Sequence, residues 1–157
     1  IWTDFNEKPS FEYAFAFTGI ENLTAKAIFA DYGNDEDEIM TLWASYQIDK
    51  LLLGVEFATD EKNTAAPGTL TDYTDDDIDA FLIMANYAVT DSAALTLRYS
   101  QAEYSDGASS VEVDKFTVSP SYSFTDNLSG LIEMSSYSVD GGAEPGDLTA
   151  LELIYTF

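Results

Sequence analysis

Alternation is the sequence feature that most constrains how this chain can fold. Apolar residues recur at every second position through runs of about ten residues, with small polar residues between them. A period of two is typical of a β-strand with two unlike faces, because an α-helix repeats every 3.6 residues. Turn residues bound nine such runs, which predict strands over residues 10–18, 23–32, 39–48, 51–59, 79–89, 93–102, 115–124, 128–137 and 148–157.

The lengths and connections of these strands are unusual for a soluble sheet. Strands in soluble sheets are usually 5–6 residues long, whereas a tilted transmembrane strand needs about 9–11. Short breaks at residues 19–22, 49–50, 90–92 and 125–127 alternate with long acidic ones such as GNDEDE and EYSDGASSVEVD. Outer-membrane barrels have tight periplasmic turns and longer outer loops. We therefore predict an all-β fold, an antiparallel up-and-down transmembrane β-barrel, as one domain over residues 1–157.

The charged residues well inside the predicted strands all fall on one face. That face otherwise carries mostly Ser, Thr, Ala and Gly, while the opposite face carries mostly aromatic and aliphatic side chains. Lipid would enforce this sorting, because Arg or Lys turned to lipid at mid-membrane costs about 2–4 kcal/mol. The charged residues predicted to line a pore are Glu12, Lys26, Glu56, Arg98, Lys115, Glu133 and Glu152.

Aromatic residues gather at the strand ends. A soluble barrel or sandwich also sorts its charges, but its polar face meets bulk water and usually carries many charged residues. Two aromatic girdles are instead what the two membrane interfaces select. We therefore favour a membrane barrel over the soluble alternative. The girdle beside the short turns is predicted to contain Phe17, Tyr46, Tyr87, Tyr122, Phe124, Tyr155 and Phe157.

The last residues add a resemblance to a known group. The ending LELIYTF, with aromatics at Tyr155 and Phe157, resembles the C-terminal strand of Gram-negative outer-membrane proteins. Residues 119–157 resemble the last three strands of porins, and the likeness upstream is architectural only. The resemblance implies an outer-membrane location and makes Tyr155 and Phe157 a signal for the barrel assembly machinery. The chain departs from the general trimeric porins in having few arginines, so their basic constriction cluster cannot be placed.

The strand number suggests a piece of a larger barrel. Bacterial single-chain barrels have even strand counts, so a further strand is expected before residue 9. The segment IWTDF is too short for a spanning strand, and we expect the C-terminal part of a barrel of about 16 strands. A complete ten-stranded barrel is the alternative. A wall of small polar residues suits a wide pore, although it also includes Trp43, Leu52, Leu82, Met84 and Tyr137.

Composition excludes several kinds of chemistry. A net charge of -23 with only six Lys or Arg argues against binding nucleic acid. With no histidine and no cysteine, neither a nucleophilic triad nor a thiolate metal site is available, so we expect no enzyme and no cofactor. The acidic runs at 35–38 and 75–79 contain weak Ca²⁺ candidates, but solvated loops are the preferred interpretation. These candidates are Asp35, Asp37, Asp75 and Asp77.

The function predicted from these patterns is passive diffusion. We expect a porin whose water-filled channel passes small hydrophilic solutes and prefers cations. The alternatives are a small closed barrel acting as a structural element or surface receptor, and a soluble ligand-binding barrel. Expected partners are outer-membrane lipid, lipopolysaccharide, the assembly machinery and a homotrimer. The wall charges would either set selectivity or pair across strands. Arg98 would then lie near Lys115 or Glu133, a register that the sequence leaves open.

Overall fold

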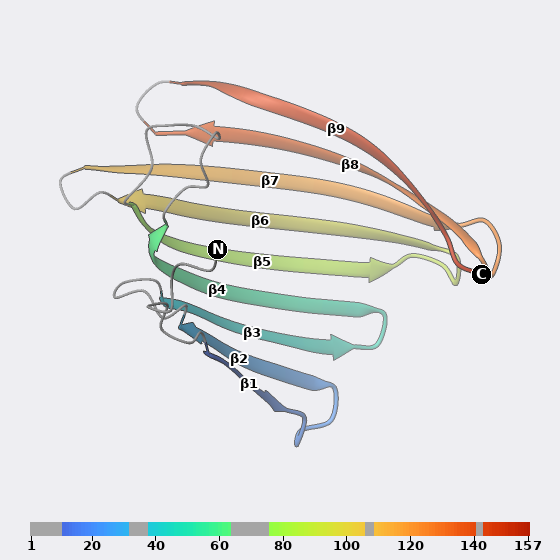
Figure 1. Ribbon diagram of the computed structural model, residues 1–157. Helices are drawn as coiled ribbons and strands as arrows, with labels where there is room; N and C mark the ends of the chain where they lie inside the picture. Colours follow the sequence, from blue (N-terminus) through green and yellow to red (C-terminus); the bar gives the residue numbers. More distant parts are fainter. Residues whose placement is uncertain (1–10, 32–37, 64–75, 106–108, 141–142) are drawn as a thin grey trace, which may run out of the picture.

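The structure is a computed structural model that describes residues 11–31, 38–63, 76–105, 109–140 and 143–157. The strands in these residues form one antiparallel sheet in which each pairs with its neighbours in sequence (Figure 1). No helix in the described part of the chain is long and apolar enough to cross a membrane. The strands are β1 (Phe11–Phe17), β2 (Leu23–Asp31), β3 (Glu38–Ile48), β4 (Leu51–Asn63), β5 (Asp76–Ala88), β6 (Ala93–Ser105), β7 (Ser110–Ser123), β8 (Leu128–Val139) and β9 (Ala143–Tyr155).

The short turns all lie at one end of the sheet, together with the C-terminus (Figure 1). Asn22 and Asp49 have φ values of 65° and 49°, a left-handed conformation that Asn and Asp adopt more readily than most residues. In the turn before β6, the Thr90 hydroxyl accepts a hydrogen bond from the Ala93 amide at 3.0 Å. Thr125 repeats this hydrogen bond before β8. The predicted short turns are confirmed.

The sheet has no dry core in the described residues. None of their hydrophobic side chains is buried. Phe15 is 65% exposed, Leu53 39%, Leu97 40% and Leu153 66%, and all four lie on the same face. A soluble barrel or sandwich would pack these side chains against one another. Their exposure is the arrangement expected of a wall that faces lipid, and the up-and-down barrel architecture is confirmed.

The strands extend beyond the predicted ends at the long-connection side. β4 runs to Asn63 rather than residue 59, β6 to Ser105 rather than 102, and β7 begins at Ser110 rather than 115. The alternation of apolar and polar residues ends there because neither face of the sheet meets hydrocarbon. Backbone hydrogen bonds between the strands do not need this alternation and continue further. The register shifts between Asp60 and Asn63, where β4 pairs with β5. The acidic connections predicted from sequence are therefore partly strand.

Candidate functional site

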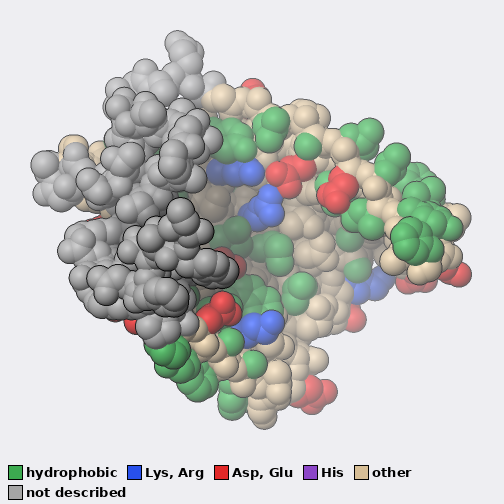
Figure 2. All heavy atoms as spheres, in the orientation of Figure 1, with side chains coloured by type: hydrophobic (Ala, Val, Ile, Leu, Met, Phe, Trp, Pro, Cys, Tyr) green, Lys and Arg blue, Asp and Glu red, His purple; other side chains and the backbone are tan. Residues whose placement is uncertain are grey.

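Strand register gathers the predicted wall charges on one face. Lys26, Trp43, Glu56 and Leu82 are paired in one row across β2 to β5. Figure 2 shows Lys, Arg, Asp and Glu side chains close together on this hollowed face. Side chains alternate along each strand, so the partners opposite one another share a face. By this rule all seven predicted wall charges lie on the same face, here called the concave wall: Glu12, Lys26, Glu56, Arg98, Lys115, Glu133 and Glu152.

Three of these charges form one cluster on β6 to β8. Arg98 Nη2 lies 2.9 Å from Glu133 Oε2, and Lys115 Nζ lies 3.5 Å from Glu133 Oε1. The three side chains are half-buried. Two cations share a single carboxylate, so the cluster keeps one positive charge. The cross-strand contact between Arg98 and Glu133, which the sequence left open, is present.

A pair of hydroxyls is buried beside this cluster. Thr117 is 2% exposed and Ser135 4%, and their hydroxyl oxygens are 2.9 Å apart. The Ser135 hydroxyl also donates to Glu133 Oε1 at 3.4 Å. β7 and β8 place Thr117 and Ser135 directly opposite each other. The two hydroxyls thus connect Glu133 of the ion pair to the neighbouring strand β7 through hydrogen bonds.

Removing one hydroxyl of this pair tests how much the network stabilises the sheet. Thr117→Val keeps the shape of the side chain but removes the hydrogen bond between the hydroxyls of Thr117 and Ser135. We therefore expect the free energy of unfolding to fall by about 0.5–1.5 kcal/mol. Urea titration of the protein folded in lipid vesicles would measure it. Thr41→Val, on the concave face of β3, is the control. Equal losses for the two variants would contradict a stabilising role for the hydroxyl pair.

Two lysines of the concave wall lie over aromatic rings. Lys26 Nζ is 5.5 Å from the centroid of the Trp43 ring, and Lys115 Nζ is 5.2 Å from that of Tyr137. An ammonium within about 6 Å of a ring face is attracted by the π electrons. Trp43 and Tyr137 are unusual residues for a polar wall, and each of their rings contacts the ammonium group of a wall lysine. Sequence alone could suggest the rings but not their lysine partners.

The predicted girdle residues lie at the short-turn end of the opposite, outward face. Tyr46 is 43% exposed and Tyr87 50%. The Tyr122 and Phe124 rings meet edge to face with centroids 5.3 Å apart. Phe157 follows the end of β9 and its ring lies 6.0 Å from that of Tyr155. Phe17 ends β1 on the same face.

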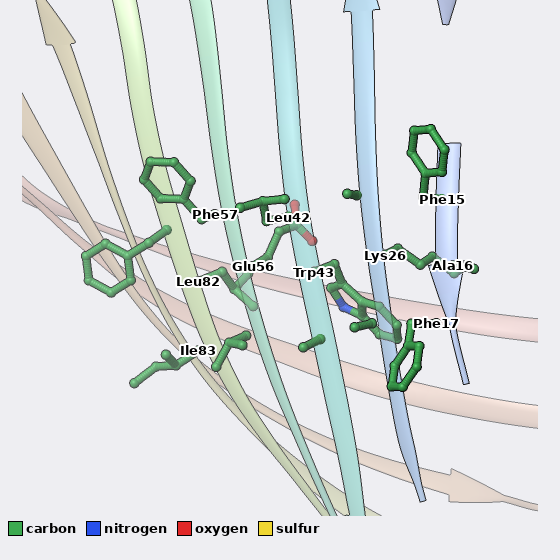
Figure 3. A pocket seen from close by; sticks show the side chains of 15 residues that line it. Phe15, Ala16, Phe17, Lys26, Leu42, Trp43, Glu56, Phe57, Leu82 and Ile83 are labelled. Atoms are coloured by element: carbon green, nitrogen blue, oxygen red, sulfur yellow. The ribbon is translucent and has the colours of Figure 1, made fainter. Parts of the chain in front are cut away.

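A hollow of about 590 Å³ crosses β1 to β5 (Figure 3). Its lining forms three neighbouring rows of the register, and the middle row is the one that contains Lys26, Trp43 and Glu56. The two flanking rows point to the outward face, so their side chains form the walls and the middle row contributes its backbone. Ala25, Ala27 and Ala44 leave the space between bulkier neighbours. This hollow faces lipid and is no place for a polar solute.

One polar cluster on the outward face escaped the sequence prediction. Tyr99 donates a hydrogen bond to Asp114 Oδ1 at 2.5 Å, and Gln101 Nε2 donates to the same oxygen at 3.2 Å. Asp114 was predicted to lie in a connection, but β7 includes it two positions before Phe116, on the face of that ring. That placement was wrong because the strand continues past its apolar part. Extending the alternation back from Phe116 would have found it.

The long-connection end of the outward face is acidic. Asp31, Glu38 and Glu61 are aligned across β2 to β4. Of the four weak Ca²⁺ candidates, Asp77 lies in β5, and the described residues contain no group of three or more carboxylates able to hold a metal ion. The other three candidates, Asp35, Asp37 and Asp75, lie outside the described residues.

An apolar outward face, a polar concave wall and a meander of long strands together define a class of protein. The protein has the fold of an outer-membrane β-barrel of the Gram-negative type. No protein-family description matches the chain, and no curated protein sequence matches it.

Solved structures of OmpT, an outer membrane protein of Vibrio cholerae, have a similar fold. The in-vitro folded form has a TM-score of 0.71 and 21% identity, over 93% of this chain and 49% of that one. The trimer form has a TM-score of 0.70 and 18% identity, over 96% and 50%. The outer-membrane expressed form has a TM-score of 0.69 and 19% identity, over 93% and 49%. The chain spans about half the length of these structures, and at this identity the likeness is one of fold.

Proposed function

We infer that the protein is a porin, forming a water-filled channel for passive diffusion of small hydrophilic solutes with a preference for cations. The observation that carries this proposal is the concave wall. Its hydroxyls, small side chains and seven charges can be wetted, whereas a narrow closed barrel fills its interior with side chains. Solutes would pass along a polar surface and need no catalytic group, so the proposal includes no enzymatic activity.

The charge distribution supports the cation preference. The seven wall charges are four carboxylates and three cations, while the whole chain has 29 acidic and six basic residues. Most of the acidic excess therefore lies outside this set of seven, in part in the aligned carboxylates at the long-connection end. Carboxylates around an entrance raise the local concentration of cations and lower that of anions, and salt screens the effect.

Planar-bilayer recording tests the proposal. We expect ohmic single-channel steps and, under a KCl gradient, a reversal potential of the sign that indicates K⁺ preference. The preference should weaken between 0.1 and 1 M salt, because the Debye length falls from about 10 to 3 Å. Folded protein that gives no steps would favour the closed barrel acting as structural element or receptor. Channels that prefer anions would contradict the charge argument.

The partners belong to the same proposal. Lipid would contact the apolar outward face. Lipopolysaccharide would contact the acidic long-connection end of that face, with divalent cations bridging its anionic groups and the protein carboxylates. The exposed aromatic pair of Tyr155 and Phe157 at the end of β9 would be read by the barrel assembly machinery. A homotrimer would bury part of the outward face, which chemical crosslinking in vesicles can detect.

A further inference from the structure

A second hollow lies on the concave wall itself, with a volume of about 290 Å³. One row of its lining runs Glu56, Leu82, Ser100, Lys115 across β4 to β7 and ends at Tyr137 on β8. The next row towards the long connections consists of Ala58, Ala80, Ala102 and Val113. The hollow therefore has charged side chains at its two sides and a mostly apolar floor between them, with Ser100 beside Lys115.

The two sides carry opposite net charges. Glu56 makes no hydrogen bond or ion pair with any described residue, and the nearest wall lysine on that side, Lys26, lies over the Trp43 ring. On the other side Lys115 and Arg98 share Glu133, which leaves one positive charge beside the hollow. The backbones of β4 and β7 are three strand spacings apart, roughly 14 Å. The Lys115 ammonium lies at the β8 side of the hollow, near Glu133 and the Tyr137 ring.

From this geometry we propose that the hollow binds zwitterionic solutes whose ammonium and carboxylate are separated by an apolar spacer. The ammonium contacts Glu56, the carboxylate contacts Lys115, and the spacer covers Leu82 and the alanine row. ω-Amino acids and short peptides have this chemistry. The inference rests on the proposed channel, because it makes the hollow a binding site along the path of the solute.

Three probes with the same carbon chain separate the two charged contacts: 6-aminohexanoate, hexanoate and hexylamine. The apparent affinity of each is measured from the reduction of single-channel current in planar bilayers. For the wild-type protein we expect 6-aminohexanoate to bind roughly threefold more tightly than either singly charged probe, since one partly exposed ion pair typically contributes such a factor. Equal affinities of the three probes would overturn the proposal.

Two wall variants assign the contacts. Glu56→Gln should make 6-aminohexanoate bind no better than hexanoate, and Lys115→Gln should make it bind no better than hexylamine. The matched controls are Glu21→Gln and Lys50→Gln, which remove the same charges at exposed short turns. Both controls should keep the roughly threefold preference of the wild type. A preference that survives both wall variants would place the zwitterion elsewhere and overturn the proposal.

A binding measurement keeps this test separate from the test of the channel. Saturation-transfer NMR on the folded protein in detergent micelles compares the same three probes without any need for conductance. Channels that open but show no zwitterion preference would overturn the binding site and leave the porin intact. Zwitterion-selective binding to a protein that never conducts would overturn the porin and support the hollow as a receptor site. Lys115→Arg, which keeps the charge, should retain the preference.

Discussion

Replacing Ile83 with arginine is expected to lower the free energy of unfolding of the membrane-embedded protein by about 2–4 kcal/mol, the cost of Arg on a lipid-facing strand at mid-membrane. Ile83 lies near the middle of β5, is 50% exposed, and pairs with Val55 and Tyr99 on the outward face. An arginine there must leave water for hydrocarbon. Urea titration in lipid vesicles, followed by tryptophan fluorescence, measures the loss.

The neighbouring residue is the control for this prediction. Leu82 pairs with Glu56 and Ser100 on the concave wall, so Leu82→Arg points its charge at water and at a carboxylate. We expect this variant to change the stability by no more than about 0.5 kcal/mol, as a surface substitution does. The two sites differ by one position along the same strand. Equal destabilisation by the two arginines would refute the assignment of the outward face to lipid.

Replacing Glu133 with glutamine is expected to reduce the preference of the channel for cations. The cluster with Arg98 and Lys115 then carries two positive charges instead of one. A unit charge about 10 Å from a permeating ion in water changes its energy by about 0.4 kcal/mol, which corresponds to about a factor of two in relative permeability. The reversal potential under a KCl gradient reports that factor directly.

A second variant, which removes a positive charge from the same cluster, tests whether the shift follows the sign of the charge. Arg98→Gln removes one positive charge from the same cluster and should shift the reversal potential the other way, towards greater cation preference. Glu21→Gln has the charge change of Glu133→Gln but lies at an exposed short turn, and it should have the smaller effect. Shifts in the same direction for Glu133→Gln and Arg98→Gln would contradict control of selectivity by the wall charges.

Much of the fold could be predicted because the alternation of apolar and polar residues along one strand shows which of its faces meets lipid and which meets water. Alternation shows which residues share a face, so Phe15 and Leu153 could be assigned to one side and Thr117 to the other before any pairing was known. The positions of the short turns follow from local turn chemistry, as at Asp49 and Thr90. The strand ends in the acidic connections were predicted less well, since backbone pairing outlasts the apolar pattern.

The sequence by itself determined the two faces, the turns and the sorting of charge, because each depends on residues adjacent along one strand. Only the tertiary structure decided which side chains meet, because register joins residues far apart in the chain. Glu133 lies 35 positions from Arg98 and 18 from Lys115, yet contacts both. Sheet pairing likewise brings Glu56 and Lys115 to the two sides of one hollow and leaves Asp114 beside Tyr99 on the outward face.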